Sequence, residues 1–284
     1  MNRLSSEKYI GYVFVAPWIV GFLIFTVHPI GYSLLMSFFR VTFTATGISM
    51  DATGFANFRS AMMDIEFIRK AMDFSIQSLI SIPLIVILAL VIALLLNLPI
   101  KGQGVFRTIF FLPVIISSGP VIDKLMDMGV MTLPTLSQYG FYHALLVSDF
   151  FLVNVLAYVL NNIIVLLWFS GVQILIFLAA LQKMAPQIYE AARIDGASLW
   201  EIFWKITLPN LSSIILVNIV YTTVVYAQST LNGVIELISS HMFKTQTGFG
   251  YASALAWIYF LLVALILAFL SGIFMIFNKK SFRG

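Results

Sequence analysis

The amino-acid sequence predicts an all-α integral membrane protein with six transmembrane helices and a charged helical hairpin between the fourth and fifth. The first observation is composition: 61% of the 284 residues are hydrophobic and only 10% are charged, and the mean hydropathy is +1.00. A soluble domain carries about 25% charged residues, so most of this chain must be solvated by lipid. The second and third observations are the long uncharged runs and the compact charged stretch, residues 183–205, that separates two of them.

The uncharged runs set the number of spans. A helix needs about 20 apolar residues to cross a hydrocarbon core roughly 30 Å thick. The third candidate is the weakest because its short core contains Pro113, Gly119 and Pro120. Such breakers are tolerated where neighbouring helices satisfy the freed backbone groups, so we expect a kinked third helix inside the bundle. The six candidate spans are residues 10–38, 74–98, 106–124, 151–181, 211–232 and 251–277.

The distribution of basic residues sets the orientation. Six spans place both termini on one side, and Lys and Arg favour the cytoplasmic side. With cytoplasmic termini, ten Lys and Arg residues fall inside and six fall outside. We therefore expect a multi-pass protein with both termini in the cytoplasm. On this topology residues 41–72 and 125–149 form outer segments, and the charged hairpin faces the cytoplasm.

Several function classes are excluded or disfavoured. The chain has no cysteine, so it has no disulfide, thiolate nucleophile or Cys-metal site. The three histidines lie far apart and show no metal-ligand spacing, and no phosphate-binding G-x-x-x-x-G-K-[ST] motif occurs. The net charge of +4 follows from membrane topology and not from a basic surface for nucleic acid. We expect no metal site and no nucleotide site in this chain.

The charged stretch predicts two short helices joined by a tight turn. Pro186 suits a first helical turn, and Gly196 suits the left-handed position that follows a helix. Ser198 with Glu201 three residues later is a capping box. The second helix should carry one apolar face at positions i, i+3, i+4 and i+7, made of Leu199, Ile202, Phe203 and Ile206.

We expect Pro209 to end this second helix and Asn210 to cap the next span. The turn carries three charged residues, Glu190, Arg193 and Asp195, beside a pair of alanines. The small alanine side chains leave a flat patch that another protein surface could approach closely. The alternative is an amphipathic hairpin that only anchors the loop at the membrane interface.

The stretch EAARIDGASLWEIFWKITLP resembles the EAA loop in the membrane-spanning subunits of bacterial binding-protein-dependent ABC importers. Residues 12–38 and FRTIFFLP at 106–113 also look like the first and third helices of carbohydrate-type permeases, particularly those of the maltose and glycerol-3-phosphate branch. The loop pattern is E-A-A, D-G-A, Phe and I-x-L-P. It is matched by Glu190, Ala191, Ala192, Asp195, Gly196, Ala197, Phe203, Ile206, Leu208 and Pro209.

The resemblance implies the type I ABC importer permease fold. It divides the chain into residues 1–72, an N-terminal helix with the first outer segment; 73–278, a five-helix core with the coupling loop 184–209; and 279–284, a cytoplasmic tail. In that family the loop docks on a separate ATPase, and ATPase closure switches the spanning helices between inward-facing and outward-facing states. The residues that would couple this chain to the ATPase are Glu190, Ala191, Ala192, Arg193, Asp195, Gly196, Ala197, Leu208 and Pro209.

The resemblance also implies partners and localisation. The chain would lie in the bacterial cytoplasmic membrane beside a second, homologous permease subunit. It would work with two cytoplasmic ATPase subunits, which hold Mg-ATP, and with an extracytoplasmic solute-binding protein. The permease itself would carry no cofactor and would not be an enzyme.

Polar residues at membrane depth are costly and mark either a solute path or contacts between helices. We expect Asn218, Tyr221 and Gln228 to share one face of the fifth span and to line the path. The other candidates are Asn161, Asn162 and Trp257. No carboxylate or ammonium lies deep in a span, which argues against a proton-coupled carrier and against a strongly charged solute.

Amides and aromatic rings suit a neutral polyhydroxylated solute, so we expect a permease for a sugar. The resemblance to the carbohydrate branch implies an oligosaccharide, with glycerol-phosphate compounds as an alternative that the absence of deep basic residues disfavours. The alternative function is a stand-alone secondary transporter or channel for a neutral polar solute. An intramembrane enzyme would need an acid, nucleophile or metal set that the sequence does not offer.

Overall fold

A computed structural model describes residues 3–44, 47–98, 151–229, 232–244 and 248–281, together with residues 104, 105, 108 and 128. The predicted third span, 106–124, and the outer segment 125–149 lie outside the described residues, apart from Thr108 and Met128. The chain forms two compact units. The first comprises Met1–Met72 and Gly233–Leu261, and the second comprises Asp73–Asn232 and Leu262–Gly284.

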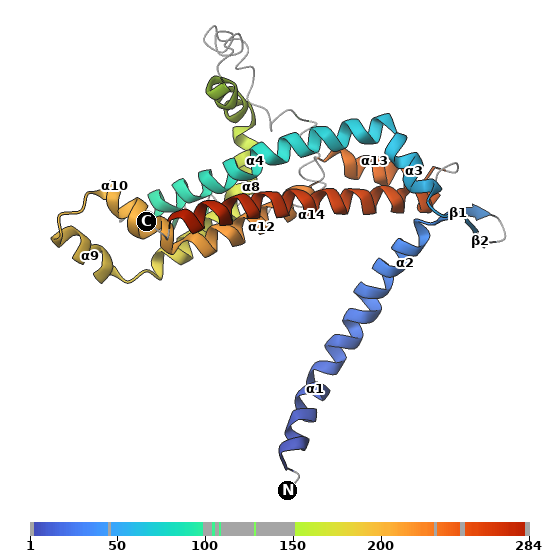
Figure 1. The fold of residues 1–284 in the computed structure, drawn as a ribbon, viewed down its shortest axis with the longest axis horizontal. Helices are drawn as coiled ribbons and strands as arrows, with labels where there is room; N and C mark the ends of the chain where they lie inside the picture. Colours follow the sequence, from blue (N-terminus) through green and yellow to red (C-terminus); the bar gives the residue numbers. More distant parts are fainter. Residues whose placement is uncertain are drawn as a thin grey trace. The chain divides into compact units, whose positions relative to one another are not determined.

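The first unit begins with a long, exposed helical rod. It consists of α1 (Arg3–Phe22), a π-helical turn η1 (Leu23–Val27) and α2 (His28–Met36) (Figure 1). The wide turn η1 precedes Pro29, whose ring would otherwise clash with the carbonyl one turn back. The span Tyr12–Met36 is long and apolar enough to cross a membrane, and none of it is buried. The first predicted span is therefore confirmed as a helix.

A small hairpin and a helix follow the rod, in the predicted outer segment 41–72. Strands β1 (Phe39–Thr44) and β2 (Gly47–Ala52) pair antiparallel, and α3 (Ala56–Met63) comes next. The side-chain amide of Asn57 donates to the carbonyl oxygens of Ser37, at 2.9 Å, and Phe39, at 3.0 Å. This amide therefore fixes the joint between the rod and the hairpin.

Three further helices complete the first unit. They are the beginning of α4 (Ile65–Asn97), α13 (Gly233–Met242) and the beginning of α14 (Gly248–Ser281). One carboxylate oxygen of Asp64 accepts the backbone N–H groups of Glu66 and Phe67, at 2.9 and 3.1 Å, and caps α4. The other oxygen accepts the hydroxyl of Tyr251 on α14, at 2.8 Å.

The second unit is a helical bundle. It contains the rest of α4 and α14, with α8 (Phe151–Gln182) and α12 (Ser212–Ala227). Side chains of α4, α8 and the start of α12 form one apolar core, which includes Ala89, Ala93, Ile174, Phe177, Leu211 and Ile219. This core positions the loop between α8 and α12.

That loop carries four short elements: α9 (Pro186–Ile194), α10 (Leu199–Ile202), a π-helical turn η3 (Phe203–Thr207) and α11 (Leu208–Asn210). The helical stretch Leu199–Asn210 meets α12 at a bend of 64°. Leu211 stands at the bend and is fully buried. The hairpin is therefore joined to the bundle through a packed residue and not through a slack linker.

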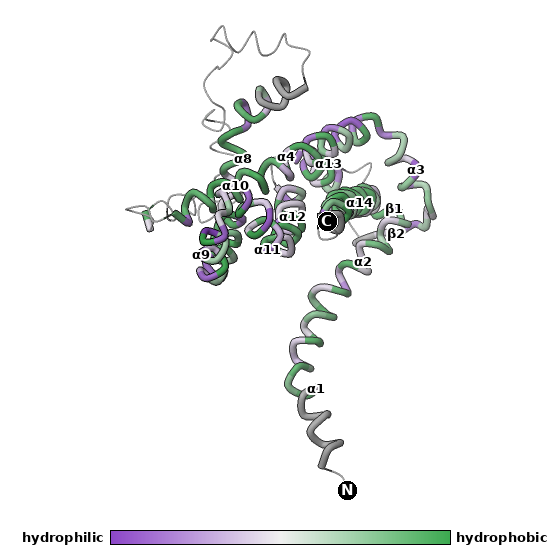
Figure 2. Tube along the Cα trace, turned by 60° about the vertical axis from the view of Figure 1, so that its left-hand side comes forward, coloured by the Kyte–Doolittle hydropathy of each residue, from purple (hydrophilic) through white to green (hydrophobic). Residues whose placement is uncertain are grey.

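Four described helices are long and apolar enough to span a membrane, and a fifth span exists if the bent pair at Leu211 counts as one. The predicted spans 74–98, 151–181 and 251–277 correspond to α4, α8 and α14, and each of these helices is longer than the predicted span. The fifth span was predicted to run over 211–232, but α12 ends at Ala227. Coloured by hydropathy, the trace is mostly hydrophobic along α14, whereas α9 carries strongly hydrophilic residues (Figure 2).

Candidate functional site: the helical hairpin and the polar core

The first helix of the hairpin has the ends that its sequence predicts. Pro186 lies in the first turn of α9, where its missing N–H costs nothing. Gly196 adopts a left-handed conformation with φ of 81°. Two backbone bonds close the end, from Gly196 N–H to Arg193 O at 3.1 Å and from Ala197 N–H to Ala192 O at 2.9 Å. These two bonds form a Schellman motif, which satisfies carbonyls that a helix end leaves free.

The second helix begins with the predicted capping box. The Ser198 hydroxyl accepts the Glu201 backbone N–H at 3.3 Å, and the Glu201 carboxylate accepts the Ser198 N–H at 3.0 Å. Lys205 donates to the same carboxylate at 3.2 Å. The bonds from Ser198, with Lys205 adding to them, lower the pKa of Glu201 to about 2. The turn between the two helices is thus fixed by the Schellman motif at the end of α9 and by the capping box at the start of α10.

Three predicted details of the second helix and its end are wrong. Leu199 does not join the apolar face: it is 76% exposed, whereas Ile202 is buried. Pro209 does not end the helix, because the wide turn η3 accommodates its ring and helical structure continues to Asn210. Asn210 does not cap α12 either, since its amide donates to the carbonyl of Ile206 at 2.8 Å.

The turn of the hairpin presents three exposed charged side chains. Glu190, Arg193 and Asp195 are all exposed, and none of them joins an ion pair within the described residues. Ala192 is buried against the hairpin, while Ile194 is 86% exposed. A flat helical surface with unpaired charges and one protruding isoleucine is suited to binding another protein.

A second polar region lies within the bundle, where α4, α8 and α12 meet. The hydroxyls of Ser81 and Tyr158 lie 2.7 Å apart, and Tyr226 donates to Ser81 at 3.4 Å. The rings of Phe74 and Phe169 contact Tyr226, with centroids 6.1 and 5.4 Å away. This hydroxyl cluster therefore has aromatic walls.

The polar region continues along α12, at Thr222 one turn before Tyr226 and at Asn218 two turns before it. Thr222 accepts the amide of Gln173 at 2.9 Å, and Asn218 lies one turn further. Asn218 is fully buried, and among the described residues neither its amide nitrogen nor its amide oxygen has a hydrogen-bond partner; the same holds for the amide oxygen of Gln173. Unpaired buried amides are costly. This polar stripe, from Ser81 to Asn218, therefore offers hydrogen-bonding atoms that the described part of the chain does not pair.

The predicted path residues are only partly brought together. Asn218 lies in this stripe, but Tyr221 is on a neighbouring face and Gln228 is exposed at the end of α12. On α8, Asn162 donates to the carbonyl of Tyr158 in its own helix at 2.9 Å, and Asn161 is exposed. Trp257 belongs to the first unit, where its ring meets Phe260 edge-on.

Sequence reasoning overlooked Ser81 and Tyr158. A small polar residue in an apolar helix carries little signal by itself, and these two are 77 positions apart. The available signal was the pair Ser78 and Ser81, three residues apart on α4 and therefore on one face.

Comparison with known proteins decides the family. Residues 58–283 match the family model described as "Binding-protein-dependent transport system inner membrane component". The chain belongs to this family. The match includes the hairpin and all of the bundle, so the resemblance noted from the EAA loop is confirmed.

Curated relatives of this permease cover nearly its whole length. The probable ABC transporter permease protein YesP of Bacillus subtilis is 32% identical, over 93% of this chain and 90% of the relative. The lactose transport system permease protein LacF of Rhizobium radiobacter is 29% identical, over 95% and 96%. The permease is thus similar to full-length transport subunits and not to a fragment of them.

A solved structure supports the fold. The permease is similar to a chain in the crystal structure of a bacterial alginate ABC transporter, in complex with an alginate pentasaccharide-bound periplasmic protein. The TM-score is 0.59, with 21% identity, and 93% of each chain is covered. The fold of a permease subunit from an ABC importer is thereby shown.

Proposed function

We propose that this permease translocates a sugar, delivered by an extracytoplasmic binding protein, through alternating access driven by a separate ATPase. The observation that carries the proposal is the hairpin α9–α10 in a chain of the binding-protein-dependent family. Its two helices are closed by a Schellman motif and a capping box, so it is rigid enough to transmit a displacement. Its exposed charges are free to pair with another protein.

The partners follow from the same proposal. The permease works beside a second permease subunit and two cytoplasmic ATPase subunits, which bind Mg-ATP and hydrolyse it. The described residues bury none of the membrane span of α1 and α2, and lipid or the second subunit is proposed to cover it. The permease itself has no enzymatic role, and its six spans place both termini in the cytoplasm.

The solute is proposed to be a neutral or weakly charged sugar, and an oligosaccharide is favoured. Two observations support this. One relative named above is a lactose transport system permease protein. The polar stripe of the bundle consists of amides, hydroxyls and aromatic rings, which suit sugar hydroxyls and the apolar faces of sugar rings. The residues proposed to meet the solute are Asn218, Gln173, Thr222, Ser81, Tyr158 and Tyr226.

The coupling role is tested by reversing one charge on the hairpin. In membranes that contain the complete importer, Glu190→Lys should abolish copurification of the ATPase and reduce sugar uptake at least tenfold. The matched control is Glu236→Lys on α13, which is also exposed but lies in the first unit. If Glu190→Lys leaves ATPase binding and uptake intact, the hairpin is not the coupling element.

The sugar proposal needs its own experiment. The purified importer is placed in liposomes with ATP inside and its binding protein outside. These liposomes should accumulate a labelled oligosaccharide. Asn218→Leu should lower accumulation while leaving ATPase binding unchanged. Transport that is driven by an ion gradient without ATP would contradict the proposal and support a secondary transporter.

A further inference from the structure

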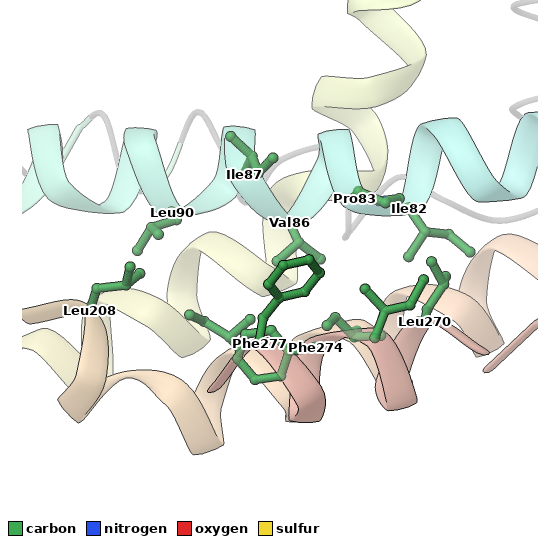
Figure 3. A pocket seen from close by; sticks show the side chains of 12 residues that line it. Ile82, Pro83, Val86, Ile87, Leu90, Leu208, Leu270, Phe274 and Phe277 are labelled. Carbon is green, nitrogen blue, oxygen red and sulfur yellow. The ribbon is translucent and has the colours of Figure 1, made fainter. Parts of the chain in front are cut away.

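The second unit contains a groove of about 320 Å³ between α4, α12 and the end of α14. Twelve side chains line it, and all are apolar. Figure 3 shows side chains of α4, such as Val86, and of α14, such as Phe274 and Phe277, pointing into the space between their helices. A sugar would lose its hydrogen bonds here, so the groove is not part of the solute path.

The length and the apolar lining of the groove suit a single hydrocarbon chain. Along α4 the lining runs from Ile82 to Leu90, a rise of roughly 12 Å at 1.5 Å per residue. One leaflet contributes about half of a hydrocarbon core of ~30 Å. The groove therefore has the depth of one leaflet.

The groove ends beside the hairpin, where the side chains change character. Leu208 lines it, and Trp204 and Lys205 precede Leu208 by one turn or less. Trp200 and Trp204 pair edge-on with centroids 5.5 Å apart, and they are 70% and 47% exposed. Lys205 is exposed and pairs with Glu201 at 3.2 Å. On α14 the sequence adds two further lysines, Lys279 and Lys280, directly after Asn278 and close to Phe277.

Exposed tryptophans beside lysines are typical of the lipid headgroup level. Lysines near a cytoplasmic membrane surface attract anionic lipids. The bend of 64° at Leu211 also turns the stretch Leu199–Asn210 away from the direction of α12. These residues therefore provide a headgroup region at the open end of a hydrocarbon-lined groove.

We infer that the groove holds an acyl chain of an anionic phospholipid, whose headgroup lies at Trp204 and Lys205. This inference rests on the proposed function only for the assignment of the hairpin to the cytoplasmic leaflet. The lipid fills space between three helices of the bundle that alternating access requires to move. It is a site that is separate from the solute path and from the exposed turn of the hairpin.

The test uses phosphatidylglycerol with a photoreactive diazirine near the middle of one acyl chain. The full importer is placed in nanodiscs of phosphatidylethanolamine and this probe, illuminated and digested, and labelled peptides are identified by mass spectrometry. Label should concentrate on groove residues of α4, α12 and α14. Ile273→Trp, which fills the groove, should reduce that label at least fivefold.

Ile276→Trp is the matched control, because Ile276 lies on the same helix and is exposed but does not line the groove. It should leave the groove label unchanged. Phe274→Ala, which widens the groove, should increase it. Unlabelled phosphatidylglycerol should compete at least threefold better than phosphatidylcholine, and Lys205→Gln should remove that preference.

Three results would overturn the inference. Label spread evenly over all lipid-facing helices would show that the probe reacts only as ordinary surrounding lipid and has no site in the groove. Equal competition by both unlabelled lipids would remove the anionic headgroup assignment. A photoreactive amino acid at position 273 that crosslinks to the second permease, or to residues 106–124, would show that protein fills the groove. None of these readouts depends on transport, so they are independent of a failure of the proposed function.

Discussion

Asp64 joins two helices of the first unit through one carboxylate. It caps α4 and binds Tyr251 on α14. Burial raises the pKa of Asp64, but the bonds from Tyr251 and from the backbone of Phe67 and Glu66, with the charge of His241, outweigh burial and lower it. The carboxylate thus remains charged over the physiological range, and it supports the folded state until the pH falls towards its lowered pKa.

Asp64→Ala is expected to destabilise the first unit by about 1 kcal/mol from the lost cap alone, and by more because Tyr251 loses its partner. Asp64→Asn should retain the cap and destabilise less, since asparagine caps as well as aspartate. Thermal unfolding of the chain in nanodiscs measures both. Equal losses in the two variants would show that the charge, and not the cap, matters.

His241 makes the same unit sensitive to acid. It is buried with its ring against Tyr251 at 5.1 Å. Burial lowers the pKa of His241, Lys244 lowers it further, and Asp64 and Glu66 partly oppose them. The folded state therefore binds the proton less readily than the unfolded state, whose histidine pKa is about 6.5. Stability is full above that value and is lost as the pH falls below it.

Backbone hydrogen exchange in α13 and the start of α14 should consequently be faster at pH 5.5 than at pH 7.5. His241→Phe keeps an aromatic ring without a titrating group, and it should remove most of this difference. His28→Phe, on the exposed rod, serves as the control and should leave the difference in place. A pH dependence that survives in His241→Phe would assign it to another residue.

At the scale of elements, α14 starts against the joint between α2 and β1. A Cβ at Gly250 would overlap the carbonyl oxygen of Phe39, and the carbonyl of Met36 is 3.1 Å away. Both neighbours are backbone atoms, which have little freedom to move. The absence of a side chain at Gly250 is therefore what allows the helix to lie against the strand.

Gly250→Ala should lower the thermal stability and the yield of folded protein. The expected cost of the overlap exceeds the approximately 1 kcal/mol by which alanine normally stabilises a helix relative to glycine. Gly272→Ala on the same helix meets nothing within 4 Å and should be neutral or stabilising. The comparison is a melting curve of each variant in the same nanodiscs. Similar curves for the two variants would contradict the close contact.

The sequence predicted the turn of the hairpin correctly but not the end of its second helix, and the difference has a physical reason. Caps and the left-handed Gly196 depend on residues two to five positions apart, which a sequence displays directly. Pro209 was expected to stop the helix, but a π-helical turn precedes it, as another precedes Pro29 in the rod. A proline reveals that a helix must adjust, and the packing around it determines whether the helix ends or widens.

At the scale of the whole molecule, most of the long helices followed from uncharged length alone, because lipid imposes that length on any spanning segment. The polar stripe did not follow, since Ser81, Tyr158 and Tyr226 meet only after three helices have packed. Asn218 could be selected because an amide in an apolar helix is conspicuous. A serine or tyrosine in such a helix is not.

The absence of cysteine makes the orientation directly testable. Ile194→Cys on the hairpin and Phe243→Cys after α13 each add one exposed thiol. With cytoplasmic termini, a membrane-impermeant maleimide should label position 243 in intact cells and position 194 only in inverted vesicles. Labelling of both positions from the same side would contradict the six-span topology.

The buried bend at Leu211 has a mechanical consequence. The stretch Leu199–Asn210 is an arm about 18 Å long, and Leu211, held in the core, is its fulcrum. A push of about 3 Å at the free end then corresponds to a rotation of roughly 10° about that leucine. Since α12 continues from the fulcrum, the proposed contact with an ATPase would convert a small sideways displacement into a tilt of the helix that carries Asn218, Thr222 and Tyr226.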